Sequence, residues 1–72
     1  MTFPERLVQL RKERKLTQKQ VFEAVGMSHL GYRRYEYGER EPAFKYLIAL
    51  ADYFGVSLDY LVGRTDKPNL DN

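Results

Sequence analysis

The chain has 72 residues, a formal net charge of +2 and no cysteine. This length fits one domain with a small core, and without cysteine neither disulfides nor thiolate-bound metals can stabilise it. The single histidine, His29, cannot form a metal site alone, so we expect no metal and no cofactor. Met1 to Leu16 lacks the apolar segment of a signal peptide. No apolar run is long enough to span a bilayer, and we therefore expect a cytoplasmic protein.

The first predicted helix covers about residues 4–15. Thr2 is its expected cap, with Glu5 three residues later in a capping-box pattern. Arg11 follows Leu7 by one helical turn, so it lies beside the apolar face and not opposite to it. The side chains predicted to face the core are Leu7, Val8 and Leu10.

The segment 17–38 predicts two helices joined by a short turn. Thr17 and Gln20 form a second capping box, and Gly26 suits the end of that helix. Ser28 is a favourable cap for the next helix, which runs to about Tyr37. This spacing is typical of a helix-turn-helix. The residues predicted to face inward are Val21, Phe22, Val25, Tyr32 and Tyr35.

Two further helices are predicted in the second half of the chain. One begins at Pro42 and is ended by Gly55; the other, capped by Ser57, covers residues 58–62 before Gly63. The fourth helix has an apolar stripe made of Phe44, Leu47, Ile48, Leu50, Ala51 and Phe54. No segment shows the alternation of a β-strand, so the fold class we expect is all-α, a five-helix orthogonal bundle. The expected organisation is a domain over residues 1–63 and a flexible polar tail over 64–72.

The charge is unevenly distributed along the chain. Residues 1–40 carry nine Lys/Arg and five Asp/Glu, whereas residues 41–72 carry three and five. The basic half contains the two-helix segment, which favours a nucleic-acid partner, although a solvated helix surface is the alternative. No arrangement of His, Ser or Cys suits nucleophilic catalysis, and no glycine-rich phosphate loop is present. We therefore expect a binding protein and not an enzyme.

The helix over 28–37 has the residue types that read the major groove of DNA, which admits one α-helix. Ser28 and the free N–H groups after it suit a phosphate. His29 and Leu30 lie in the first turn, where they suit a base edge and a thymine methyl. Arg34 suits guanine O6 and N7, and Arg33 a base or a phosphate.

Each of these residues has an alternative role. His29 and Arg34 are also compatible with a plain solvated surface, and Leu30 with the core if the helix is rotated. The two tyrosines, Tyr32 and Tyr35, fit the core better than they fit stacking on bases. Gly31 is either a site of close backbone approach or a tolerated helix interruption.

The runs LTQKQVFEAVGMSHLGYRRYEYGEREP and LADYFGVSLDYLVG resemble the Cro/repressor-like, XRE-type helix-turn-helix domain of phage repressors and bacterial regulators. The resemblance covers about residues 6–63 and implies a lambda-repressor-like fold. It implies that His29, Leu30, Gly31 and Arg34 read bases, to which we add Arg33. It implies backbone contacts by Gln18, Tyr37 and Arg40, so that the phosphate contacts we expect are Thr17, Gln18, Ser28, Tyr37 and Arg40. It also implies a partly buried ion pair between Arg11 and Glu36.

The chain departs from the family pattern at two positions. Phe22 replaces the usual alanine at a close helix–helix approach, and Gly31 replaces a residue that is usually polar. One hypothesis is that Gly31 leaves room for a recognition helix shifted by the Phe22 ring.

These observations predict a sequence-specific double-stranded DNA-binding regulator, acting as a homodimeric repressor on a palindromic operator. The expected dimer interface is Val56, Leu58 and Tyr60. The alternative is an antitoxin or adaptor, a protein-interaction module with secondary DNA binding, whose partner would cover the fourth and fifth helices. RNA binding is disfavoured if the tyrosines are buried, because single-stranded RNA is bound by exposed aromatic rings.

Overall fold

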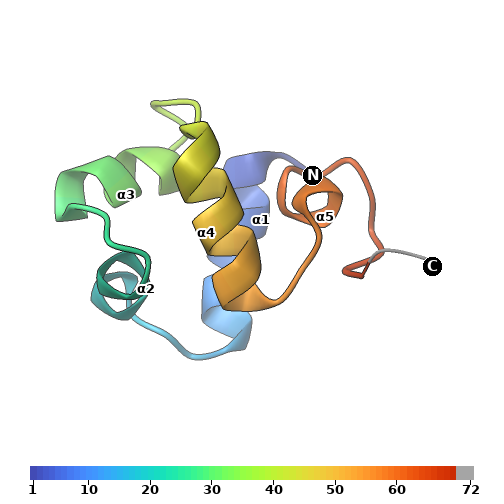
Figure 1. Cartoon of the computed structure of the whole chain (residues 1–72), viewed down its shortest axis with the longest axis horizontal. Coiled ribbons are helices and arrows are strands. Elements are labelled where there is room, and N and C mark those ends of the chain that lie inside the picture. The colour runs from blue at the N-terminus through green and yellow to red at the C-terminus, as the bar shows by residue number, and fades with distance from the viewer. Residues whose placement is uncertain (70–72) are drawn as a thin grey trace.

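The computed structural model describes residues 1–69, and these form five helices without a β-strand (Figure 1). The expected all-α, five-helix fold is confirmed. The bounds are α1 Phe3–Glu13, α2 Gln18–Ala24, α3 His29–Glu36, α4 Phe44–Phe54 and α5 Leu58–Leu61. Among these residues no helix is long and apolar enough to cross a membrane.

Local capping explains where most helices begin. The Thr2 and Thr17 hydroxyls each accept the backbone N–H three residues later, and Glu5 and Gln20 complete both capping boxes. Ser28 caps α3, and Ser57 caps α5 in the same way. The exception is α4, which begins at Phe44 after Ala43 and has no side-chain cap, two residues later than Pro42 predicts. All four expected caps are thus confirmed.

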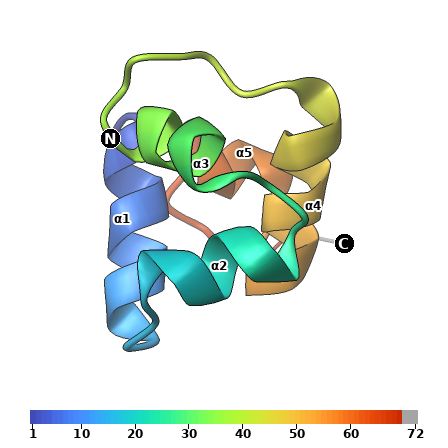
Figure 2. The same ribbon diagram turned by 90° about the vertical axis from the view of Figure 1, so that its left-hand side faces the viewer.

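The helices enclose one core, to which every helix contributes. Figure 2 shows α2 and α3 side by side, with α1 and α4 on either side of them and α5 behind. The buried apolar side chains are Leu7, Leu10, Val21, Met27, Tyr32, Tyr35, Leu50, Ala51, Phe54 and Leu61. Val8, Phe22 and Val25, which we expected to face inward, are partly buried.

The predicted apolar stripe of α4 is only partly buried. The Phe44 side chain is 73% exposed and Ile48 is 38% exposed. The buried side chains of α4 are Leu50, Ala51 and Phe54. On a helical wheel they centre near Phe54, and Phe44 and Ile48 lie beside Ala51 at the edge of this face. The other helices cover the centre of the stripe and leave this edge open.

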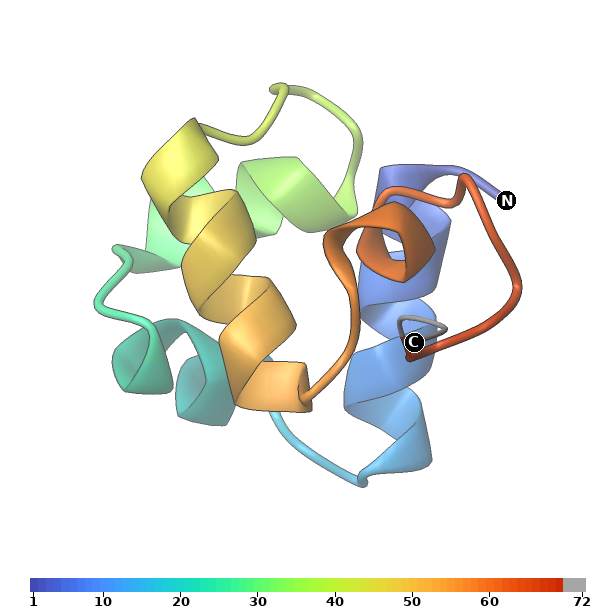
Figure 3. The same cartoon turned by 45° about the vertical axis from the view of Figure 1, so that its right-hand side comes forward.

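The two ends of the described chain meet at α5 (Figure 3). The Arg6 guanidinium, which was not among the groups predicted to face the core, is buried. It lies 3.6 Å from the centre of the Tyr60 ring and 3.3 Å from an Asp66 carboxylate oxygen. The Ser57 N–H donates to the Pro68 carbonyl at 2.8 Å. Residues 64–69 therefore run along α1 and α5. The flexibility expected of the tail stays a prediction, and residues 70–72 lie outside the described part.

Candidate nucleic-acid interface

The turn between α2 and α3 fixes how these helices meet. Gly26 has a φ of +74°, a left-handed conformation that glycine adopts without strain. The N–H of the next residue, Met27, then donates back to the Phe22 carbonyl at 2.8 Å. Ser28 follows and starts α3. The sequence AVGMS therefore folds into a turn of a few residues that packs α3 across α2.

One face of α3 is buried and holds the helix in place. Tyr32 and Tyr35 lie in the core, which confirms the core interpretation over stacking on bases. The Tyr35 hydroxyl accepts the Ala43 N–H at 2.9 Å, and its ring packs edge-on against Phe3. The C-terminal end of α3 is thus tied to α1 and to the residue that precedes α4.

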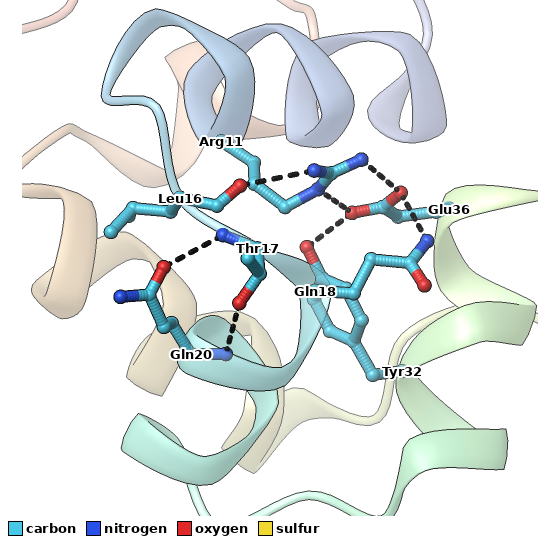
Figure 4. Close-up of polar contacts among 7 residues, drawn as sticks. All are labelled: Arg11, Leu16, Thr17, Gln18, Gln20, Tyr32 and Glu36. Carbon is cyan, nitrogen blue, oxygen red and sulfur yellow. Dashed lines mark hydrogen bonds and ion pairs between the residues drawn. The ribbon is translucent and has the colours of Figure 1, made fainter.

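A polar network centred on Glu36 joins α1, α2 and α3 (Figure 4). Arg11 donates to the two carboxylate oxygens at 2.6 and 3.1 Å, and to the Leu16 carbonyl at 3.1 Å. Gln18 donates to Oε1 at 2.9 Å and the Tyr32 hydroxyl to Oε2 at 2.5 Å. The structure thus contains the ion pair that the resemblance implies. The Glu36 side chain is 2% exposed and that of Arg11 15% exposed.

The network keeps Glu36 ionised. Burial alone would raise the pKa of its carboxyl, but the hydrogen bonds from Arg11, Tyr32 and Gln18 outweigh burial and lower the pKa below its ordinary value. Burial, followed by the hydrogen bond to Glu36, raises the pKa of Tyr32. The hydrogen bond to Glu36 raises the pKa of Arg11. At neutral pH the site therefore holds a carboxylate, a guanidinium and a neutral phenol.

The opposite face of α3 is open to solvent. His29, Leu30, Arg33 and Arg34 are all exposed, whereas Gly31 is half-buried. Leu30 is 55% exposed, so the alternative that places it in the core is wrong. Hydrogen-bond donors and one apolar side chain thus project from a helix whose other face is fixed, as a major-groove reader requires.

A sequence model described as Helix-turn-helix matches residues 7–61, which contain the turn, the buried face of α3 and the Glu36 network. The chain belongs to the XRE-type helix-turn-helix family. YobD of Bacillus subtilis (strain 168), an uncharacterized HTH-type transcriptional regulator, is 42% identical over 90% of this chain and 58% of its own length. The cryptic phage CTXphi transcriptional repressor RstR of Vibrio cholerae is 39% identical over 89% and 57%. The chain thus spans less than two thirds of these curated relatives.

Solved structures of helix-turn-helix proteins have the same fold. The P22 c2 repressor, crystallised with a synthetic operator, superposes with a TM-score of 0.83 at 31% identity, over 90% of this chain and 98% of that one. A transcriptional regulator from Listeria innocua gives 0.81 at 36% identity, over 97% and 65%. The similarity to the P22 protein thus extends over almost its whole solved chain.

The expected phosphate-binding residues lie at the starts of α2 and α3 and just after the end of α3. Thr17 and Ser28 each accept a backbone N–H through the cap oxygen, which leaves the hydroxyl hydrogen for another acceptor. Gln18 is engaged with Glu36 and so braces α3. Tyr37 is exposed, with Arg33 5.1 Å above its ring, and Arg40 is exposed in the α3–α4 loop.

The two departures from the family pattern do not touch each other. The Phe22 ring packs against His29 and Tyr32. A Cβ on Gly31 would lie 3.0 Å from Ser28 Oγ and 3.8 Å from Met27 Cε, with no Phe22 atom within 4 Å. Gly31 therefore makes no direct room for the Phe22 ring. The sequence interpretation missed the contact between Phe22 and His29, although both are aromatic and seven residues apart across a short turn.

Proposed function

We propose that this chain binds double-stranded DNA in a sequence-specific manner and regulates transcription, with α3 in the major groove. The observation that carries the proposal is the division of α3 into two faces. Glu36 and the buried tyrosines fix one face, while His29 and Arg34 present nitrogen donors that have no hydrogen-bond partner among residues 1–69. Groups in this state can donate to base edges without breaking contacts of the fold. The operator bound to the related P22 repressor supports the same ligand class.

The proposed contacts divide into bases and phosphates. The residues that we place at the bases lie in the first turn of α3 or on its exposed side: His29, Leu30, Gly31, Arg33 and Arg34. The residues that we place at the DNA backbone precede or follow the exposed part of that helix: Thr17, Gln18, Ser28, Tyr37 and Arg40. Phosphate contacts fix the register of the protein on DNA, and base contacts supply the specificity.

We propose a homodimeric repressor acting on a palindromic operator, with half-sites about 34 Å apart. A repressor among the relatives supports this direction of regulation. The bacterial or phage origin of the relatives supports a cytoplasmic location. The proposed dimer surface is Val56, Leu58 and Tyr60. Leu58 is 40% exposed, whereas Arg6 already covers one side of the Tyr60 ring, so Leu58 is the more accessible of the two.

The second candidate is an antitoxin or adaptor that binds another protein and uses DNA secondarily. The exposed Phe44 and Ile48 on α4 favour it, because large apolar side chains that the monomer leaves open are typical of protein contacts. A second copy of this chain would cover the same residues equally well.

Selection of bound sites from a random duplex pool, followed by gel shifts at two salt concentrations, tests the proposal. We expect an enriched palindrome and an affinity that falls steeply with salt, as counterion release requires. Arg64→Ala is a matched control. It removes an exposed cation that follows α5 and lies in neither α2 nor α3, so it should leave the base preference unchanged. Failure to enrich any sequence, together with a protein partner that copurifies, would favour the second candidate.

A further inference from the structure

The first residue of α3 is stacked on α2. The Phe22 and His29 rings lie with their centroids 5.5 Å apart and their planes at 25°. Among residues 1–69 the imidazole nitrogens make no hydrogen bond, so the Phe22 ring is the group that orients this side chain. An exposed histidine without such a contact samples several rotamers, whereas a stacked one must break the stack to turn.

Phe22 also contacts a residue of the core. Its ring packs at 46° against Tyr32, with centroids 6.4 Å apart. Tyr32 is fully buried, and its hydroxyl is bound to the Glu36 carboxylate. A continuous set of contacts thus runs from the ion-pair network through two rings to the imidazole. The orientation of His29 is therefore coupled to the part of the site that fixes α3.

The stack leaves the nitrogen-bearing edge of the imidazole available. Phe22 and His29 line the same open groove between the starts of α2 and α3, together with Lys19 and Gln18. A neutral imidazole has one N–H donor and one acceptor nitrogen. If its plane is fixed before binding, less side-chain freedom is lost when it meets a base edge.

We propose that Phe22 is a positioning residue for base recognition. Its ring fixes the imidazole plane of His29, so that one base pair of each half-site is discriminated through Phe22 although Phe22 does not itself touch DNA. This inference rests on the proposed DNA binding by α3. It makes the aromatic ring on α2 a determinant of specificity and not only of packing.

The test measures binding of the selected operator and its single-base-pair variants to the full chain and four variants. His29→Ala identifies the base pair that His29 reads. Phe22→Leu keeps an apolar side chain but removes the stack, and we expect it to reduce discrimination at that same base pair roughly threefold to tenfold, the value of one hydrogen bond. The preference read by Arg34 should persist. The double variant should lose no more than His29→Ala, since both changes remove one interaction.

Val25→Ala is the matched control, because it truncates a partly buried side chain at the C-cap of α2. It should lower stability and leave the profile of base preferences unchanged. Three results would refute the positioning role and leave the proposed function standing. They are equal weakening by Phe22→Leu at every base pair, an unchanged profile of base preferences, and additive losses in the double variant. If the wild-type chain prefers no base pair, the proposed function fails, and the positioning role fails with it.

A measurement without DNA keeps the inference testable if Phe22→Leu folds poorly. In proton NMR of the wild-type chain, the imidazole protons of His29 should show ring-current shifts and cross-peaks to the Phe22 ring. Imidazole protons at their random-coil positions, without such cross-peaks, would overturn the inference. In folded Phe22→Leu the shifts should disappear while the Tyr32 ring signals stay dispersed.

Discussion

Truncation of Glu36 should destabilise the whole domain, because this carboxylate joins three helices. Glu36→Ala removes the acceptor of Arg11, Gln18 and Tyr32 together. The Arg11 guanidinium would keep only its bond to the Leu16 carbonyl. The tyrosine hydroxyl, which lies in the core, would lose its acceptor among the described residues.

The size of the loss in free energy of unfolding follows from how deeply the ion pair is buried. Removal of one partner of a buried ion pair costs about 3–5 kcal/mol. The Arg11 side chain is 15% exposed, so water can partly solvate the stranded guanidinium. We therefore expect a loss of about 2–3 kcal/mol, toward the value of hydrogen bonds to charged groups. A chain of this size has a free energy of unfolding of about 4–11 kcal/mol. At about 4–8 °C per kcal/mol, the melting temperature should fall by roughly 10–20 °C.

Thermal and urea unfolding followed by circular dichroism measure this loss. Glu39→Ala is the matched control, since it removes an exposed carboxylate just after α3 and should change stability by less than about 0.5 kcal/mol. Replacement of both Arg11 and Glu36 by apolar residues should cost less than Glu36→Ala, because no charge is then stranded. A Glu36→Ala melting temperature within the range of the Glu39→Ala control would refute the reasoning.

Three other outcomes are expected. The lowered pKa of Glu36 stabilises the fold above the unfolded-state pKa of about 4.3, and this contribution is lost as the pH falls through the lower folded-state pKa. The difference in free energy of unfolding between wild type and Glu36→Gln, measured in urea, should therefore narrow as the pH is lowered below about 4.3. A difference that widens would contradict this. In competition gel shifts, Arg34→Ala should relax the preference at one base position, whereas Arg40→Ala should lower the affinity for all sequences about equally. The reverse pattern would mean that Arg40 contacts a base and Arg34 a phosphate. Gly31→Ala should not raise the free energy of unfolding by the about 1 kcal/mol usual for this change in a helix, because the new Cβ would crowd the Ser28 cap oxygen. A rise of that size in urea unfolding would disprove the crowding.

The sequence predicted the helices well because their boundary signals are local. Thr17 with Gln20, and Ser28 with the N–H three residues later, form caps that depend on a few neighbouring residues. The turn at Gly26 is equally local. The core tyrosines followed from helical spacing. These signals were sufficient to locate the α2–α3 unit and to separate the exposed face of α3 from its buried face.

The failures of prediction involve residues far apart in the chain. Arg6 was not among the side chains predicted to face the core, yet it is buried, in contact with Tyr60 and Asp66. Phe44 and Ile48 fit the apolar period of α4, but a period shows which residues share a face and not how much of that face the other helices cover. Burial of such residues depends on the packing angle of the helices, which no local pattern contains.

The Glu36 network separates the groups that stabilise the domain from the groups that would read DNA. The side chains of Arg11 and Gln18 donate hydrogen bonds to Glu36 inside the network, whereas the Arg34 side chain makes no hydrogen bond within the described chain. Substitution on the open face of α3 can therefore change base preference with little effect on stability. His29 is the exception, because its stack connects it through Phe22 to the core. Of the proposed base-reading side chains, it is the one whose orientation depends on how α2 and α3 pack.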